Sequence, residues 1–309
     1  MREEIGKVVL DMTNYSGKDL YSDGDIEDVL LDIVKNHDEE EYNSIIMDKK
    51  DWAVLYHLSP VRQNIISFLD IEPDSTVLEI GAGCGAITGA LASKAKKVTC
   101  IELSKRRSTI NAYRNKEYDN IEIKVGNFTD VEKGLTEKFD YITLIGVLEY
   151  AASYINMEQP YDKFLQIISK HLKPNGKIIV AIENRLGMKY WAGCKEDHTG
   201  QYFSGLDEYQ EFTHVKTFSK AELTELFVNN GMYNIEFYYP YPDYKLPMRI
   251  YSDEYLPGLE ELNNNMRNFD NSRMLLFDEG KAFNSVIKEG CFPQFVNSFL
   301  VVMQGGKGL

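Results

Sequence analysis

The stretch VLEIGAGCGAITGALA combines a single carboxylate with three alternate glycines, a composition that lets a ligand approach the backbone closely. Glu79 precedes Gly81, Gly83 and Gly85, and Glu102 stands 21 residues after Gly81. A carboxylate at this spacing can accept hydrogen bonds from both ribose hydroxyls of an adenosine-containing cofactor. The glycines alone do not choose among such cofactors, because the loop also fits the loose GxGxx[G/A] pattern of dinucleotide sites.

Glu79 is the residue that separates these ligand classes. In a dinucleotide site the position two residues before the first glycine is normally apolar, because the strand is buried and its ligand carries an anionic pyrophosphate. A carboxylate there would repel phosphates and would suit a ligand with positive charge. The alternative interpretation of Glu79 is a carboxylate that caps the next helix or pairs locally.

Histidines are the expected acid–base groups, and one of the five stands where an acceptor would bind. His198 follows Asp197 in the long segment after the fifth expected strand, and we expect it to act as a general base with Asp197 assisting. The alternative is a histidine that only stabilises its loop. Glu196, Asp197, His198 and His214 could form a metal site, but they lack helical ligand spacing, so no metal is expected.

Short apolar strands alternate with helices from residue 76 onward. The expected strands are 76–80, 97–102, 121–125, 141–145, 177–182, 233–239 and 298–303. The alternation of the first five with helices indicates βαβ units and an α/β fold with a largely parallel sheet, which binds ligands beyond the carboxyl ends of its strands. Asn127 follows the third strand, where its amide can bond an adenine edge while Phe128 packs on the ring.

The two ends of the chain depart from this alternation. Residues 1–51 are expected to form an acidic helical segment, with 14 acidic and 6 basic residues in the first 50, and either a solvated face or a partner surface would explain the charge. Residues 52–309 form the main domain, with insertions at about 184–218 and 240–297. Seven tyrosines between Tyr233 and Tyr255 predict either stacking on sugar rings or aromatic cross-strand pairs.

Composition narrows the classes of partner. The net charge of −14 disfavours nucleic acid as the main partner. The four cysteines are far apart and are expected to be reduced thiols in a cytoplasmic protein. We expect no signal peptide, and no apolar run approaches the roughly 18 residues that span a bilayer. The sequence indicates no particular oligomeric state.

The motif series resembles that of class I S-adenosylmethionine-dependent methyltransferases. It comprises ExGxGxG from Glu79, then Glu102, Gly126-Asn127-Phe128 and Leu148-Glu149-Tyr150, and it covers about residues 52–303. The resemblance implies a Rossmann-like, doubly wound sheet of seven strands that ends in an antiparallel hairpin. It implies S-adenosylmethionine as cofactor, with a site that contains Glu79, Gly81, Gly83, Glu102, Asn127, Phe128, Gly146 and Leu148.

A narrower resemblance concerns methyltransferases of bacterial surface-polysaccharide and glycan clusters. WAVLYHLSPVRQN, AIENRLGMKYWAGCKEDHTG and YYPYPDYKLP carry it. It implies that residues 54–64 fold over the cofactor, with Tyr56 and Arg62 as contacts, and that the acceptor is a hydroxyl of a sugar or glycan intermediate. Two other hypotheses stay open, namely a catalytically silent cofactor-binding partner subunit and an NAD-dependent oxidoreductase.

Overall fold

The computed structural model describes residues 2–155, 158–210, 214–262 and 272–305. The chain divides into two compact units. The first comprises Met1–Leu144 and Lys170–Lys177, and the second comprises Ile145–Ser169 and Ile178–Leu309. The division cuts two strands, β6 (Phe139–Ile145) and β7 (Leu172–Glu183), so that each contributes residues to both units.

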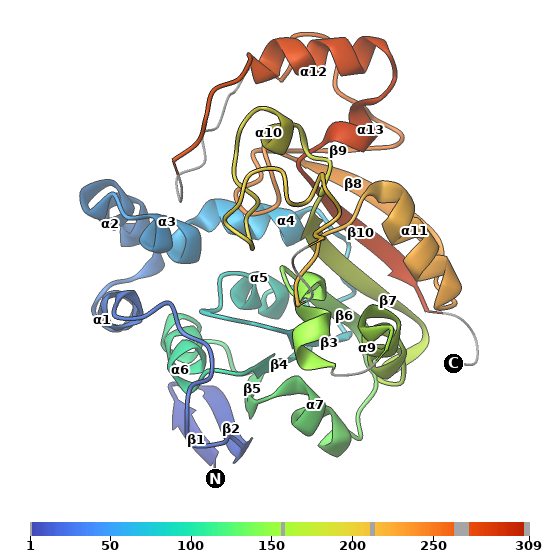
Figure 1. The fold of residues 1–309 in the computed structure, drawn as a ribbon. Coiled ribbons are helices and arrows are strands. Elements are labelled where there is room, and N and C mark those ends of the chain that lie inside the picture. Colours follow the sequence, from blue (N-terminus) through green and yellow to red (C-terminus); the bar gives the residue numbers. More distant parts are fainter. Residues whose placement is uncertain (1, 156–157, 211–213, 263–271, 306–309) are drawn as a thin grey trace. The chain divides into compact units, whose positions relative to one another are not determined.

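The first unit is built on a mostly parallel sheet (Figure 1). Its other strands are β1 (Arg2–Ile5), β2 (Val8–Asn14), β3 (Thr76–Ile80), β4 (Lys97–Glu102) and β5 (Ile121–Gly126). They hydrogen-bond in the order β1-β2-β5-β4-β3-β6, and every pair except the β1–β2 hairpin is parallel. The expected parallel α/β core is thus confirmed. Apolar runs such as TVLEI explain it, because a strand buried on both faces needs no alternation.

Helices connect these strands, and short polar side chains begin several of them. The helices after the strands are α5 (Thr88–Ala92), α6 (Lys105–Arg114), α7 (Phe128–Val131) and the 3₁₀ turn η3 (Glu132–Gly134). Ser104 and Asn127 cap α6 and α7 by accepting hydrogen bonds from backbone N–H groups of their first turns. These caps place the starts of both helices directly after the carboxyl ends of β4 and β5.

The N-terminal segment contributes strands as well as the expected helix. Its helices are α1 (Ile26–Asn36), η1 (Glu39–Glu41), α2 (Tyr42–Lys49), α3 (Trp52–Leu58), η2 (Pro60–Gln63) and α4 (Asn64–Ser67). Before them, β1 and β2 form a hairpin around Gly6, whose φ of +59° favours glycine, and β2 pairs with β5. Residues 1–51 therefore extend the sheet in addition to forming the acidic helix.

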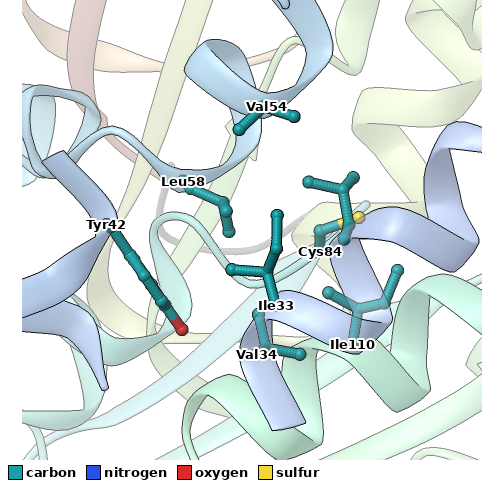
Figure 2. Packing of buried hydrophobic residues seen from close by; sticks show 8 residues of the cluster. Ile33, Val34, Tyr42, Val54, Leu58, Cys84 and Ile110 are labelled. Atoms are coloured by element: carbon teal, nitrogen blue, oxygen red, sulfur yellow. The ribbon is translucent and has the colours of Figure 1, made fainter. Parts of the chain in front are cut away.

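A buried cluster joins these N-terminal helices to the glycine loop (Figure 2). The cluster consists of Leu30, Ile33, Val34, Tyr42, Val54, Leu58, Cys84 and Ile110. Cys84 belongs to the loop after β3 and Ile110 to α6, whereas the other side chains come from α1, α2 and α3. The apolar stripe of α1 therefore packs on the segment that the sequence singles out for ligand binding.

The second unit contains the remaining strands in the order β7-β10-β8-β9. Its elements after β6 are η4 (Leu148–Tyr150), α8 (Ala151–Tyr154), α9 (Pro160–Ser169), α10 (Met188–Trp191), α11 (Lys220–Asn229), β8 (Tyr233–Tyr241), β9 (Arg249–Ser252), α12 (Glu279–Lys288), α13 (Phe292–Phe295) and β10 (Ser298–Gln304). The antiparallel pairing of β8 with β10 confirms the expected terminal hairpin. Ser219 and Glu222 form a capping box at the start of α11.

The expected count of seven strands is wrong, because the described residues form ten. The three additional strands are β1, β2 and β9. β1 and β9 have four residues each, and β1 reads REEI, so neither shows an apolar alternation long enough to indicate a strand. Their pairing partners in the sheet stabilise them instead.

Two expectations from composition can be compared with the structure. In the described ranges no helix is both long and apolar enough to cross a membrane. All four cysteines are unpaired, as expected, and Cys84, Cys100 and Cys194 are buried.

A buried ion-pair network should stabilise the first unit. Nε of Arg107 lies 2.9 Å from Oε1 of Glu27, whose side chain is fully buried, and Arg107 also pairs with Asp23. Replacing Arg107 by Met leaves these carboxylates without their cation, so we expect urea denaturation to show a loss of about 3–5 kcal/mol in the free energy of unfolding.

The neighbouring Arg106 provides the matched control. It pairs with Asp28 at the surface, where its side chain is 40% exposed, so Arg106→Met should cost less than about 1 kcal/mol. Equal losses in the two variants would contradict the assignment of the buried network as the stabilising one.

Candidate functional site

In the glycine loop after β3, Gly83 and Gly85 lack a side chain for different reasons. Gly81, Gly83 and Gly85 have φ values of +73°, +53° and +77°, which L side chains rarely adopt. A Cβ on Gly85 would lie 2.4 Å from Oδ1 of Asn111, so packing explains this glycine. A Cβ on Gly83 would meet no atom within 4 Å from the other residues that the structure describes, apart from its two chain neighbours. The backbone at Gly83 is therefore open to a ligand.

Glu102, the last residue of β4, holds this loop in place. Its Oε2 accepts a 2.8 Å hydrogen bond from the backbone N–H of Gly83, and its Oε1 accepts a 2.9 Å bond from the N–H of Ser104. A carboxylate offers about four lone-pair positions, so both oxygens can accept further bonds. The carboxylate can thus brace the loop and still accept ribose hydroxyls, as expected from its spacing.

Glu79 lies in β3 and is almost completely buried, with 4% exposure. Its Oε2 accepts hydrogen bonds from Oγ1 of Thr88 at 2.6 Å and from Sγ of Cys100 at 3.3 Å. Burial raises the pKa of Glu79 to about 7, against the lowering effect of these two bonds. The local pairing that the sequence left open is therefore present, and the carboxylate makes no ion pair within the described ranges.

Four other expected cofactor contacts also lie in the first unit. Asn127 uses Oδ1 to accept from the N–H and hydroxyl of Thr129, which leaves its amide nitrogen to donate. Phe128 is 5% exposed at the start of α7. The guanidinium of Arg62 lies over the ring of Tyr56, 4.0 Å from the ring centroid. The structure thus pairs Tyr56 with Arg62.

The two remaining expected contacts lie in the second unit, in the turn that follows β6. Gly146 has a φ of +70°, and a Cβ there would lie 2.9 Å from the hydroxyl of Tyr244. Leu148 is fully buried. The next residue is Glu149, whose backbone oxygen accepts bonds from the Tyr161 hydroxyl and the N–H of Lys216, both at 3.3 Å. The turn therefore aims a buried glutamate inward.

His198 lies at the centre of a cluster of buried carboxylates in the second unit. Its Nδ1 is 3.0 Å from Oε1 of Glu196, and its Nε2 is 3.6 Å from Oε1 of Glu149 and 3.8 Å from Oε2 of Glu183. The ring of Tyr150 contacts it edge-on, with 5.3 Å between centroids. We call Glu149, Glu183, Glu196 and His198 the glutamate–histidine cluster.

The pKa of His198 reflects this surrounding charge. Burial alone would lower the pKa, but the negative charge of Glu183 and the nearby carboxylates of Glu149 and Glu196 outweigh it and raise the pKa well above its usual value. Burial raises the pKa of Glu149. An imidazole held in the protonated form does not accept a proton, so the base role expected for His198 needs a change in the charge around it.

Asp197, the expected helper of His198, has other partners. It accepts a hydrogen bond from the Tyr190 hydroxyl, and it pairs with Nζ of Lys189 at 2.7 Å and Nζ of Lys245 at 2.6 Å. Against the effect of burial, these two ammonium groups lower the pKa of Asp197 well below its usual value. The carboxylate that contacts His198 is instead Glu196, the residue one position earlier.

Two residues of the cluster were not among the site residues expected from the sequence. Glu149 and Glu183 are 1% and 0% exposed, and they stand directly after β6 and at the end of β7. Their position at the carboxyl ends of adjacent expected strands was the available signal. The contact with His198 could not be read from the sequence, because the histidine belongs to an irregular loop.

The tyrosines between Tyr233 and Tyr255 were expected either to stack on sugar rings or to form aromatic cross-strand pairs. Tyr239, Tyr241, Tyr244 and Tyr251 are at most 5% exposed, and Tyr239 is the cross-strand partner of Tyr251. The aromatic pairing within the β8–β9 hairpin is therefore confirmed for that pair. Tyr255 is 67% exposed.

Comparisons with known proteins point to one family. Residues 56–236 match the family described as Methyltransferase domain. The ubiquinone biosynthesis O-methyltransferase of Rickettsia canadensis is 24% identical over 188 residues, which cover 59% of this chain and 75% of that protein. The ribosomal RNA small subunit methyltransferase A of Clostridium acetobutylicum is 35% identical over 112 residues, covering 36% of this chain and 37% of that protein.

A solved structure shares the fold. It is a chain from the complex of the Haloferax volcanii Trm112 methyltransferase activator with a methyltransferase, with a TM-score of 0.50 and 17% identity. The match covers 86% of this chain and 98% of that chain, and at this identity the likeness concerns the fold alone.

The two glycines of the loop give a test of their different roles. Gly83→Ala and Gly85→Ala both impose a positive φ on alanine, which costs about 1–2 kcal/mol. The Cβ of Gly85→Ala also overlaps Asn111, and overpacking of this kind adds about 1–3 kcal/mol. Urea denaturation should therefore show the larger loss for Gly85→Ala, and equal losses would contradict the packing role of Gly85.

Proposed function

The chain belongs to the methyltransferase domain family, as a class I S-adenosylmethionine-dependent methyltransferase, and from this premise we propose that it methylates a hydroxyl of a sugar or glycan intermediate. In this reaction a C–O bond forms at the methyl carbon while the C–S bond breaks. The electron pair returns to the sulfur, which leaves as the neutral thioether of S-adenosylhomocysteine. The hydroxyl proton of the acceptor passes to a carboxylate of the glutamate–histidine cluster in this proposal, and the protein otherwise contributes mainly by aligning the reacting atoms.

The observation that carries the cofactor assignment is the buried carboxylate of Glu79 beside the open backbone of Gly83. We assign Glu79 to the positive charge of the cofactor and Glu102 to its ribose hydroxyls. Gly81 and Gly83 allow the close approach. A buried carboxylate without a cation of its own is stabilised by a cationic ligand and would repel a pyrophosphate.

Other residues complete the proposed cofactor site. Asn127 has its amide nitrogen left to donate to the adenine, beside Phe128. We assign Tyr56, Arg62, Gly146 and Leu148 as further contacts on the basis of the sequence resemblance. The cation–π pair of Arg62 with Tyr56 supports a fixed position for these two side chains.

We place the acceptor at the glutamate–histidine cluster in the second unit. His198 supplies the imidazole expected from the sequence, and Glu149 and Glu183 surround it. Asp197 is a positioning residue in this proposal, because it holds Lys189 and Lys245 rather than the imidazole. A sugar acceptor is supported by the glycan-cluster resemblance and by exposed aromatic faces, with Trp191 43% and Tyr255 67% exposed.

The pKa of Glu79 makes cofactor binding depend on pH. With a pKa of about 7, the carboxylate must lose a proton to attract the cationic cofactor as the pH rises from 6 to 8. Calorimetric titration with S-adenosylhomocysteine, whose ammonium is cationic, should therefore show affinity rising about tenfold over this interval. Glu79→Gln should bind more weakly at pH 8 and should lose this dependence.

The same variant tests the sign of the effect on stability. Glu79 has a higher pKa in the folded than in the unfolded chain, so its contribution to stability is present below about pH 4.5 and is lost as the pH rises through about 7. The free energy of unfolding of Glu79→Gln should therefore exceed that of the unsubstituted chain by up to about 3 kcal/mol at pH 8 and by little at pH 5.

Binding of NADH in place of S-adenosylhomocysteine would reject the cofactor assignment.

Transfer to an acceptor can be measured with a labelled methyl donor and glycan intermediates, followed by mass spectrometry of the labelled product. His198→Asn should lower kcat by about 10²–10⁴-fold while leaving the affinity for S-adenosylhomocysteine unchanged. His214→Asn, an exposed histidine in the same unit, is the control and should transfer at the unsubstituted rate. Cofactor binding without label on any acceptor would instead support a catalytically silent partner subunit.

A further inference from the structure

We propose that Glu149, Glu183 and His198 form a binding site for one divalent transition-metal cation. The three ligands come from three segments, namely the turn after β6, the end of β7 and the loop after α10. Cation binding can be established without a methyl donor or acceptor. A role for the cation in activating the acceptor hydroxyl rests on the proposed function.

The distances in this cluster suit shared ligation better than hydrogen bonding. One ligand atom from each of the three residues lies within 4.8 Å of the others. Nε2 of His198 is 3.6 Å from Glu149 and 3.8 Å from Glu183, both longer than a hydrogen bond. Ligand bonds of about 2.0–2.1 Å in a tetrahedral site place the donor atoms about 3.3 Å apart. The two imidazole–carboxylate distances would need to shorten by about 0.3–0.5 Å to reach this spacing.

Unmet bonding capacity points to the same ligand. Within the part of the chain that the structure describes, Oε2 of Glu149 and Oε2 of Glu183 are buried without a hydrogen-bond partner. Oε1 of Glu183 is 3.0 Å from Nζ of Lys245, which leaves Oε2 facing the imidazole. Buried carboxylate oxygens are costly unless donors or cations surround them, so these atoms favour a bound cation.

Glu196 supplies the outer contact that metal-bound histidines usually have. Its Oε1 contacts Nδ1 of His198 at 3.0 Å, and its Oε2 accepts from the N–H groups of His198 and Thr199. The hydroxyl of Tyr209 also donates to Oε1. When Nδ1 donates to a carboxylate, the lone pair of Nε2 is directed to the opposite side of the ring, where Glu149 and Glu183 lie.

The acidic groups gathered around His198 favour a bound cation. Four carboxylates with side chains no more than 6% exposed, those of Glu149, Glu183, Glu196 and Asp197, are grouped here. The basic side chains beside them are those of Lys189 and Lys245. These four acidic side chains outnumber the two ammonium groups, which favours a cation at this position.

The donor set selects the class of cation. A site made of carboxylates alone suits Mg²⁺ or Ca²⁺. An imidazole ligand favours transition metals such as Zn²⁺. Mn²⁺ accepts both carboxylate and imidazole ligands. Three protein ligands leave at least one position open. If the proposed function holds, an acceptor hydroxyl would occupy it, and Oε2 of Glu149 would accept the hydroxyl proton.

Metal binding by the full chain is the direct test. Chelator-treated protein should bind one Zn²⁺ or Mn²⁺ per chain in calorimetric titration, more tightly than Mg²⁺. Glu149→Gln, Glu183→Gln and His198→Asn should each weaken binding at least about tenfold, since loss of even an outer contact costs about 10–100-fold. Glu196→Gln should fall within that outer-contact range.

Exposed residues of the same unit provide matched controls. Glu225→Gln and His214→Asn remove the same chemical groups at exposed positions, and both should bind the metal as the unsubstituted chain does. The proposal would be overturned if the unsubstituted chain bound no metal. It would also be overturned if the three ligand variants bound the metal with the same affinity as the unsubstituted chain. Methyl transfer by the metal-free protein at an undiminished rate would reject a catalytic role of the cation and leave the proposed function standing.

A second measurement covers the case in which the ligand variants do not fold. Pulsed electron paramagnetic resonance of the Mn²⁺-loaded unsubstituted chain should show coupling to one imidazole nitrogen. A spectrum of Mn²⁺ surrounded only by oxygen ligands would overturn the proposed site.

Discussion

The hydrogen bond from the backbone N–H of Gly83 to Glu102 is the contact on which the first unit depends. It adds a side-chain anchor at Gly83 to the backbone hydrogen bonds that the N–H groups of Gly81 and Ala82 donate to the carbonyl of Ile101. The same carboxylate accepts from the N–H of Ser104, so it also sets the start of α6. From α6, Arg107 reaches Glu27 in α1, and Cys84 packs among the side chains of α1 to α3. The acidic N-terminal segment therefore acts as a support for the loop, and part of its negative charge is used inside the unit.

Buried charge is organised differently in the second unit. Lys189 and Lys245 flank Asp197, and the short distances between these groups give the aspartate a stable negative charge. Tyr190 donates to the same carboxylate. A compensated group of this kind can define the position of a loop because removing one member would leave the others buried and unpaired. Asp197 thus fixes the loop that carries His198, even though its carboxylate does not pair with the imidazole. This separation explains why adjacency in the sequence was a poor guide to the partner of His198.

The sequence predicted the central architecture because its signals are local. The runs TVLEI and KVTCIE each specify structure within a few residues, and they correctly predicted β3 and β4, with Glu102 as the last residue of β4. The hairpin of β1 and β2 was missed because REEI has one buried residue and depends on pairing for its stability. The cluster around His198 was missed for a related reason. Glu149 and Glu183 are 34 positions apart in the sequence, and an irregular loop precedes His198. Side-chain contacts between residues so far apart in the sequence depend on tertiary structure.

The buried carboxylates fall into two kinds, and the difference bears on function. Glu27 and Asp197 have cationic side chains within ion-pair distance, so folding alone compensates their charge. Among the described residues, Glu79 instead accepts from a hydroxyl and a thiol, and Oε2 of Glu149 has no hydrogen-bond partner. A buried carboxylate without a cation is costly, and a positive charge that arrives from outside the chain would offset this cost. In the functions proposed above, that charge is a sulfonium nucleoside at Glu79 and a metal cation at Glu149.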